Sequence, residues 1–172
     1  PHKTEAVGVR MCVRTAKEVA AAFEQSTAAV RSHAPDAAID GILVQEMVEG
    51  GVEAIVGIDN DPLFGPAIMF GLGGIFTEVL KDVAFRLAPV SASMAHEMIR
   101  QVKGHALLTG ARGRPPCDLD ALADVLCRLL AMALDLKAHL AELDINPLFV
   151  LPAGRGVKAA DALIKPRSDS SS

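Results

Sequence analysis

Hydrophobic and polar residues alternate with a period of two in several short segments of the chain. In residues 7–14 (VGVRMCVR), apolar side chains occupy every second position, which predicts a half-buried β-strand. Other short apolar runs are separated by turns rich in Gly, Asn and Asp, and these runs are typical of strands. The predicted strands are 7–14, 41–48, 52–59, 66–70, 76–80, 84–87, 142–150 and 157–163.

Three longer segments show the period of an α-helix and begin at residues that cap helices. Thr15 and Glu18 form the pattern T-x-x-E of a capping box. Ser91 and Asp118 are residue types that accept hydrogen bonds from the first turn of a helix. The predicted helices run from Thr15 to about residue 33, from Ser91 to about 102 and from Asp118 to about 134.

The order of these elements predicts the fold class. Runs of strands followed by helices, with a hairpin near the end, favour an antiparallel or mixed sheet with helices laid on it, an α+β fold. Residues 104–116 are rich in Gly and Pro and are predicted to form a loop. The serine-rich tail after Arg167 is too polar to pack, and we expect it to be frayed.

Composition narrows the function classes. The chain has 172 residues, 51% of them hydrophobic, so a disordered chain is excluded. A net charge of −4 and an aromatic content of 3% argue against nucleic acid as a partner. No apolar run approaches the ~20 residues of a membrane span, and three scattered cysteines favour a reducing, cytoplasmic location. The start at Pro1 indicates an excised domain or a processed fragment.

The segment 144–147 (DINP) is the best candidate for a metal site. Alternate residues of a strand point to the same side, so Asp144 and Asn146 share one face, and Leu143, Ile145 and Phe149 the other. A hairpin brings Asp161, on the proposed return strand, beside Asn146. Carboxylate and amide oxygens are the ligands that Mg²⁺ takes. Solvent-facing strand residues are the alternative interpretation.

A second candidate is the segment after the predicted strand 41–48. Where a chain leaves a buried strand, its free backbone groups suit the edge of a purine ring. Glu46 and Val48 lie at this point, and Glu53 follows close enough to accept hydrogen bonds from ribose hydroxyls. An ordinary hairpin with surface glutamates is the simpler alternative.

Two further loops carry features suited to anions. Gly73 and Gly74 allow a phosphate to approach the backbone closely, although a tight turn or bulge explains them equally well. Arg112 and Arg114 lie in a Gly/Pro loop that suits closure over an anionic ligand, with a solvated loop as the alternative. The histidines at 33, 96, 105 and 139 have no partner recognisable from spacing.

Taken in order, five segments resemble one family. They are HKT at 2–4, VQEMVEGGVEAIVGI, FGPAIMFGLGGIFTEVLKDVAFRLAPV, GARGRPPCDL and AELDINPLFV. Their sequence is similar to the ATP-grasp domain of the NDP-forming acyl-CoA synthetases, which include the ADP-forming acetate–CoA ligases and the β subunit of succinyl-CoA synthetase. The resemblance covers residues 2 to about 165 and implies one ATP-grasp domain over 1–166, incomplete on its N-terminal side, with a disordered tail at 167–172.

The resemblance implies a role for each matching residue. Asn146 and Asp161 are expected to bind Mg²⁺, with Asp144 assisting at the metal. Glu46 and Val48 are expected to bind adenine, and Glu53 the ribose of ATP or ADP. His2 and Lys3 match a segment near the phosphates, and His2 is a candidate for the phosphohistidine relay. Val7 replaces a glycine that relatives have in this segment.

The implied activity is that of an ADP-forming acid–CoA ligase: acid, CoA and ATP give acyl-CoA, ADP and phosphate. The resemblance further implies partners, namely the nucleotide and the CoA-binding and ligase domains or subunit of the same enzyme. The family's lysine-bearing strand, upstream of HKT, is not in this sequence, so this chain alone is expected to be inactive. Two alternatives remain: a non-catalytic regulatory or interaction lobe, as in proteins fused to an acetyltransferase domain, and a different ATP-grasp ligase.

Overall fold

A computed structural model describes residues 9–74 and 81–167 and divides the chain into two compact units, Pro1–Met47 and Val48–Ser172. Each unit is described by itself. The predicted strand 76–80, the predicted tail and the segment with His2 and Lys3 lie outside the described residues. No helix in the described part of the chain is long and apolar enough to cross a membrane.

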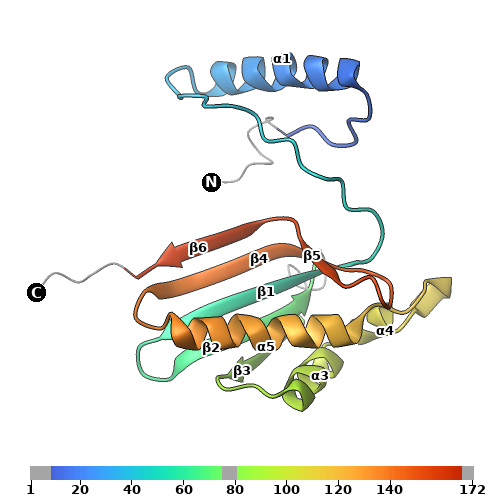
Figure 1. Ribbon diagram of the computed structural model, residues 1–172, viewed down its shortest axis with the longest axis vertical. Coiled ribbons are helices and arrows are strands. Elements are labelled where there is room, and N and C mark those ends of the chain that lie inside the picture. Colours follow the sequence, from blue (N-terminus) through green and yellow to red (C-terminus); the bar gives the residue numbers. More distant parts are fainter. Residues whose placement is uncertain (1–8, 75–80, 168–172) are drawn as a thin grey trace, which may run out of the picture. The chain divides into compact units, whose positions relative to one another are not determined.

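The first unit is built around one helix, α1 (Ala16–His33), drawn in blue in Figure 1. Its N-terminus has the predicted capping box. The Thr15 side chain accepts a hydrogen bond from the Glu18 backbone nitrogen (3.2 Å), and Glu18 Oε2 accepts one from the Thr15 nitrogen (3.0 Å). These two bonds satisfy backbone donors that the first turn of a helix otherwise leaves free, which fixes where α1 begins.

The strands predicted at 7–14 and 41–48 are not formed in the part of the chain that the structure describes. Residues 9–14 and 41–48 are irregular, and apolar side chains in both segments are exposed. A strand needs a neighbour to bond its backbone, and the residue pattern alone does not provide one. The hairpin between 41–48 and 52–59, given above as the simpler alternative for the segment with Glu46, is therefore not formed in the described residues either.

The second unit contains an antiparallel six-stranded sheet in the order β3-β2-β1-β4-β5, with β6 also paired to β4. In Figure 1 the strands β6, β4, β1, β2 and β3 lie side by side in that order. Their bounds are β1 (Val52–Asp61), β2 (Gly65–Leu72), β3 (Val83–Leu87), β4 (Leu140–Val150), β5 (Val157–Ala159) and β6 (Ala162–Pro166).

Two long helices cover one face of this sheet. Ser91 caps α3 (Ala92–Gln101) and Asp118 caps α5 (Leu119–Asp135), as predicted. Figure 1 shows α5 lying over the sheet. Between these helices, the predicted loop contains a single turn of helix, α4 (His105–Leu108), and a 3₁₀ turn, η1 (Ala111–Gly113).

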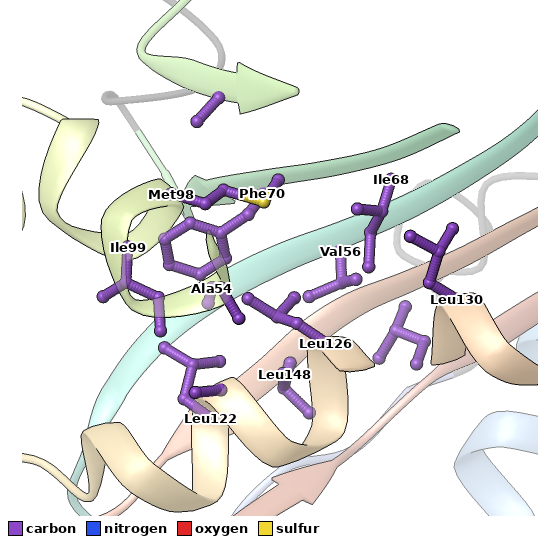
Figure 2. Packing of buried hydrophobic residues seen from close by; sticks show 14 of the residues in the cluster. Ala54, Val56, Ile68, Phe70, Met98, Ile99, Leu122, Leu126, Leu130 and Leu148 are labelled. Carbon is purple, nitrogen blue, oxygen red and sulfur yellow. The ribbon is translucent and has the colours of Figure 1, made fainter. Parts of the chain in front are cut away.

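The core lies between the sheet and these helices. Alternate residues of β1 and β2 are buried, and Figure 2 shows them packed against side chains of α3 and α5. The fully buried members include Val56, Ile68, Phe70, Met98, Ile99, Leu122, Leu126, Leu130 and Leu148. Because the helices occupy this face, the opposite face of the sheet carries exposed polar residues of β1 and β4 such as Glu53, Asp59 and Glu142.

A change of register in β4 corrects one prediction about the faces. Leu143 pairs with Ile58 and Ile145 with Val56, so both face the core as predicted. The register with β1 then shifts by one residue, and Phe149 pairs with exposed Glu53 on the opposite face. An extra residue in one strand reverses the alternation beyond it, which is why strict alternation placed Phe149 wrongly.

Candidate functional site

The metal-site candidates come together on the face of the sheet opposite α3 and α5, where β4 meets the junction of β5 and β6. Ile145 pairs with Ala162 and Leu148 with Ala159, and this common register puts Asn146 opposite Asp161. The Asn146 nitrogen donates to the Asp161 carbonyl oxygen at 3.2 Å. Asp161 lies in the break between the two strands rather than within a continuous return strand. The segment between Asn146 and Asp161, which are 15 residues apart, thus folds back on itself as predicted.

The same junction is held by backbone bonds on both sides. The Ala160 nitrogen donates to the Pro147 carbonyl oxygen at 3.0 Å. Pro147 has no backbone N–H of its own to donate, so it suits a position where regular pairing is interrupted. Asp161 Oδ1 accepts a hydrogen bond from the Ala162 nitrogen at 3.0 Å, which fixes the direction of its carboxylate.

The electrostatics of this cluster favour a cation. Burial raises the pKa of Asp144, and the negative charge of Asp161 raises it further. Two carboxylates that destabilise each other's charge are stabilised when a divalent cation lies between them. In the strand register Asp144 pairs with Leu163, two residues beyond Asp161, so the Asp144 and Asp161 positions are close on the paired strands.

These donors fit Mg²⁺ and not a softer metal. In the described ranges no group of three or more His, Cys, Asp or Glu side chains forms a metal cage. Mg²⁺ does not need one, because it commonly takes one or two carboxylates and completes its octahedron with water and phosphate oxygens. Asp144, Asn146 and Asp161 supply two carboxylates and one amide oxygen, the donor set that such a site uses.

Glu53 lies on β1, the strand that pairs with β4, near the end of the sheet where β1 begins. It is exposed near the start of β1, four residues before Gly57, which pairs with Asp144. Its carbonyl oxygen accepts a hydrogen bond from the Gly73 nitrogen at 2.8 Å. Four residues of a strand span about 13 Å. Glu53 is thus separated from Asp144 by a length of strand, whereas Asn146 lies nearer to it, in the register shift of β4 opposite Ala54–Val56.

Glu53 lines a pocket of about 250 Å³ at the end of the sheet. The pocket brings together features that the sequence shows only separately: Glu53, the Gly73–Gly74 turn and Arg114. Apolar side chains of β1, β2 and α4 complete the lining, namely Val52, Leu72 and Leu107. Sequence analysis missed this convergence, because it depends on the packing of α4 and η1 against the end of the sheet.

The remaining site candidates fall in three places. Glu46 is exposed in the irregular segment of the first unit, and Val48 is half-buried at the start of the second. His2 and Lys3 lie outside the described residues. The roles assigned to these four residues stay predictions.

The sequence profile of the ATP-grasp domain family matches residues 1–165, and the chain belongs to this family. Among characterised relatives, the β subunit of the ADP-forming acetate–CoA ligase II of Pyrococcus furiosus is 42% identical over 163 residues. That alignment covers 95% of this chain and 69% of the subunit. The ADP-forming acetate–CoA ligase I of Archaeoglobus fulgidus is 46% identical over 156 residues, which are 91% of this chain and 22% of that enzyme.

Solved structures agree with this assignment. The dinucleotide-forming acetyl-coenzyme A synthetase 1 of Candidatus Korarchaeum cryptofilum, in complex with coenzyme A and Ca-AMPCP, matches with a TM-score of 0.90 at 43% identity. It covers 96% of this chain, which in turn covers 71% of that one. The same synthetase with coenzyme A and Mg-AMPPCP matches with a TM-score of 0.83 at 40% identity. The predicted fold class and family are confirmed.

Proposed function

We propose that this chain is the ATP-binding portion of an ADP-forming acyl-CoA synthetase. The whole enzyme would convert an acid, CoA and ATP into acyl-CoA, ADP and phosphate through a phosphohistidine. Relatives of this family are named as ADP-forming acetate–CoA ligases, which favours this function over a non-catalytic regulatory lobe.

The observation that carries the proposal is the meeting of Asp144, Asn146 and Asp161 at one junction of the sheet. Asn146 and Asp161 lie opposite each other in the strand register, and the charge of Asp161 raises the pKa of Asp144. A set of two carboxylates and an amide oxygen suits a Mg²⁺ ion that also binds nucleotide phosphates. A relative of 40% identity is described in complex with Mg-AMPPCP.

In the proposed site, Asn146 and Asp161 would hold Mg²⁺, and Asp144 would assist at the metal. Mg²⁺ supplies charge neutralisation for the phosphates of ATP. Glu53 accepts from the ribose hydroxyls, while Glu46 and Val48 bind the adenine edge. Lys3 contacts the phosphates, and His2 takes part in phosphoryl transfer.

The domain boundaries and partners belong to the same proposal. We take residues 1–166 as one ATP-grasp domain and 167–172 as a tail. CoA-binding and ligase domains, or a subunit that carries them, are the proposed partners. A relative named as a β subunit agrees with such an assembly.

The test is Mg-ATP binding followed by the rise in melting temperature of the protein. A ligand that binds only the native state raises its stability. We expect the melting temperature of the wild-type protein to rise saturably with Mg-ATP. The variants Asp161→Ala and Asn146→Ala should need at least a tenfold higher Mg-ATP concentration for the same rise. The control Asp59→Ala should respond to Mg-ATP as the wild-type protein does. Asp59 is an exposed aspartate of β1 that pairs with Glu142.

Unchanged Mg-ATP binding in both Asp161→Ala and Asn146→Ala would contradict the proposed metal site. Acyl-CoA formation by the whole enzyme, with the double variant Asn146→Ala/Asp161→Ala beside it, tests the activity. If the double variant forms acyl-CoA at the wild-type rate, the site does not serve this reaction.

A further inference from the structure

The carboxylate of Asp118 bonds to two separate parts of the second unit. Its Oδ1 accepts a hydrogen bond from the Ala121 nitrogen at 3.1 Å, and this bond caps α5. Its Oδ2 accepts a hydrogen bond at 3.0 Å from the nitrogen of Gly156, which lies 38 residues further along the chain, between β4 and β5. Each oxygen of this carboxylate therefore holds a different element.

The cap of α5 does not by itself need an aspartate. In the same chain, Thr15 caps α1 and Ser91 caps α3 with one hydroxyl oxygen each. Serine and asparagine cap helices as well as aspartate does. Hydrogen bonds from Gly156 and, to a smaller extent, from Ala121 hold the pKa of Asp118 below its usual range. The second oxygen of Asp118 is thus explained by the bond to Gly156 and not by the cap.

The backbone next to Asp118 is bonded to the same turn, residues 151–156. The Asp118 nitrogen donates to the Leu151 carbonyl oxygen at 2.8 Å. Cys117, which is buried, forms an antiparallel bridge with Pro152. The carboxylate of Asp118 completes this contact, so the N-terminus of α5 and the turn are held together.

The turn leads through β5 directly to Asp161. β5 has three residues, and among the strands of the described sheet it pairs with β4. The Leu151 nitrogen donates to the Gly156 carbonyl oxygen (3.1 Å) before β5, and the Ala160 nitrogen donates to the Pro147 carbonyl oxygen (3.0 Å) after it. A short strand with one neighbour is weakly held by its own pairing. Its position therefore depends on how its two ends are anchored.

The anchor at Gly156 and the proposed metal ligand lie at opposite ends of β5, five residues apart. The helix on the other side of the anchor is firmly packed, because Leu122, Leu126 and Leu130 of α5 are fully buried in the core. Without the bond to α5, β5 can shift against β4, and such a shift moves Asp161 relative to Asn146.

We propose that Asp118 is a positioning residue for the metal site: its bond to Gly156 anchors β5 to α5 and so holds Asp161 opposite Asn146. This inference rests on the proposed function, in which Asn146 and Asp161 bind Mg²⁺. Asp118 acts through the backbone of the β4–β5 hairpin and is not itself a proposed ligand of the metal or the nucleotide.

The test uses Asp118→Ser, which keeps one oxygen for the cap of α5 and lacks the second oxygen for Gly156. The readout is the Mg-ATP concentration that gives half of the maximal rise in melting temperature. We expect this concentration to be about threefold to tenfold higher in Asp118→Ser than in the wild-type protein. Asp118→Asn should act in the same direction, because its amide nitrogen is a donor and cannot accept from Gly156.

The dependence on Mg²⁺ separates a positioning role from a general loosening of the protein. The titrations are repeated with ATP and a chelator, so that no metal bridges Asp161 and the phosphates. The half-saturating concentrations of the wild-type protein and of Asp118→Ser should then agree within about twofold, because the site that Asp118 positions is no longer used. General loosening would weaken the binding of ATP and of Mg-ATP alike.

Ser91→Ala is the matched control for the loss of a helix cap. Ser91 caps α3, which lies against β3 at the opposite edge of the sheet from β5. Its loss should lower the melting temperature without ligand but leave the half-saturating Mg-ATP concentration within about twofold of the wild-type value. Circular dichroism checks that each variant is folded.

Three results would overturn the positioning role. Asp118→Ser and Asp118→Asn could bind Mg-ATP like the wild-type protein while Asp161→Ala binds it more weakly, their loss of affinity could be the same without Mg²⁺, or Ser91→Ala could reproduce it. Unchanged Mg-ATP binding in Asp161→Ala is a different result: it would contradict the proposed metal site itself, and the role of Asp118 with it.

Discussion

The two units of the chain use similar residue patterns with different outcomes. In the second unit, alternating apolar residues of β1 and β2 are buried against α3 and α5, and Leu126 has an exposed fraction of 0%. In the first unit, residues 9–13 and 42–47 carry a comparable apolar pattern, yet Leu43 is 79% exposed. Alternation thus marks a segment able to form a strand, and neighbouring strands and covering helices decide whether one forms.

The sharpest way to test this comparison is the same substitution in both units. Leu126→Ala should lower the free energy of unfolding of the second unit by about 2–5 kcal/mol, because it leaves a cavity beneath the sheet. Leu43→Ala should change it by less than about 0.5 kcal/mol, since the side chain is already in water. Urea denaturation measures both. A cost above about 1.5 kcal/mol for Leu43→Ala would show that the segment is packed in solution.

A smaller effect is expected for a buried charge. Asp82 is only 6% exposed, and its two carboxylate oxygens accept hydrogen bonds from the Lys103 and Gly104 nitrogens, both at 2.9 Å. Asp82→Ala should cost about 2–3 kcal/mol, because two backbone donors lose a charged acceptor. Asp36→Ala, in an exposed turn of the first unit, is the matched control and should be nearly neutral. The measurement is again the midpoint of urea denaturation, and equal midpoints for the two variants would refute the assignment.

Lowering the pH should destabilise the second unit through Asp118, the residue that caps α5. Hydrogen bonds from the Gly156 and Ala121 nitrogens hold the pKa of Asp118 below its usual range. Because the folded pKa is the lower one, this stabilisation is present above the ordinary pKa of about 4 and is lost as the pH falls through the folded value. Asp118→Asn should lower the melting temperature at pH 7 by about 2–4 °C and flatten its decline below about pH 4. A decline of unchanged steepness in the variant would rule out Asp118 as the titrating group.

The smallest effect is expected at the cap of α1. Hydrogen bonds from the Arg14 and Thr15 nitrogens lower the pKa of Glu18, but both partners are its near neighbours in sequence. Glu18→Gln should therefore fray the first turn of α1 and leave the melting temperature of the second unit within about 1 °C. Amide exchange of residues 15–18 measures the fraying. Faster amide exchange in β1 or β4 as well would mean that the cap stabilises more than its own helix.

Local signals in the sequence predicted the parts of the fold that depend on near neighbours. Thr15, Ser91 and Asp118 cap helices as expected, because a cap and its first turn lie within four residues of each other. The strands 52–59, 66–70 and 84–87 are formed for a different reason, since each has a paired neighbour. Residues 41–48 show the same residue pattern, but in the described ranges no neighbouring strand pairs with them.

In the candidate site, too, the contacts between near neighbours in the sequence were predictable and the contacts between distant segments were not. The position of Asp161 opposite Asn146 follows from one short hairpin, so sequence spacing was sufficient to predict it. The meeting of Glu53 with Arg114 joins segments about sixty residues apart through the packing of α4, and no spacing rule covers it. The shift in β4 that turns Phe149 away from the core was hidden as well, because it depends on the register with β1.

The hairpin that carries Asp144, Asn146 and Asp161 occupies one uninterrupted stretch of the chain, and the backbone bonds that join Asn146 to Asp161 and Pro147 to Ala160 are internal to that stretch. The entropy lost in closing so short a loop is small, so these groups can meet early in folding, before distant strands are in place. Insertions elsewhere in the chain leave their spacing untouched. A lengthened tip at Gly154–Arg155 would preserve it too, whereas one residue added between Pro147 and Leu148 would separate the carboxylates. Natural variation in chain length should therefore accumulate at the tip and be excluded from the strands beside Pro147.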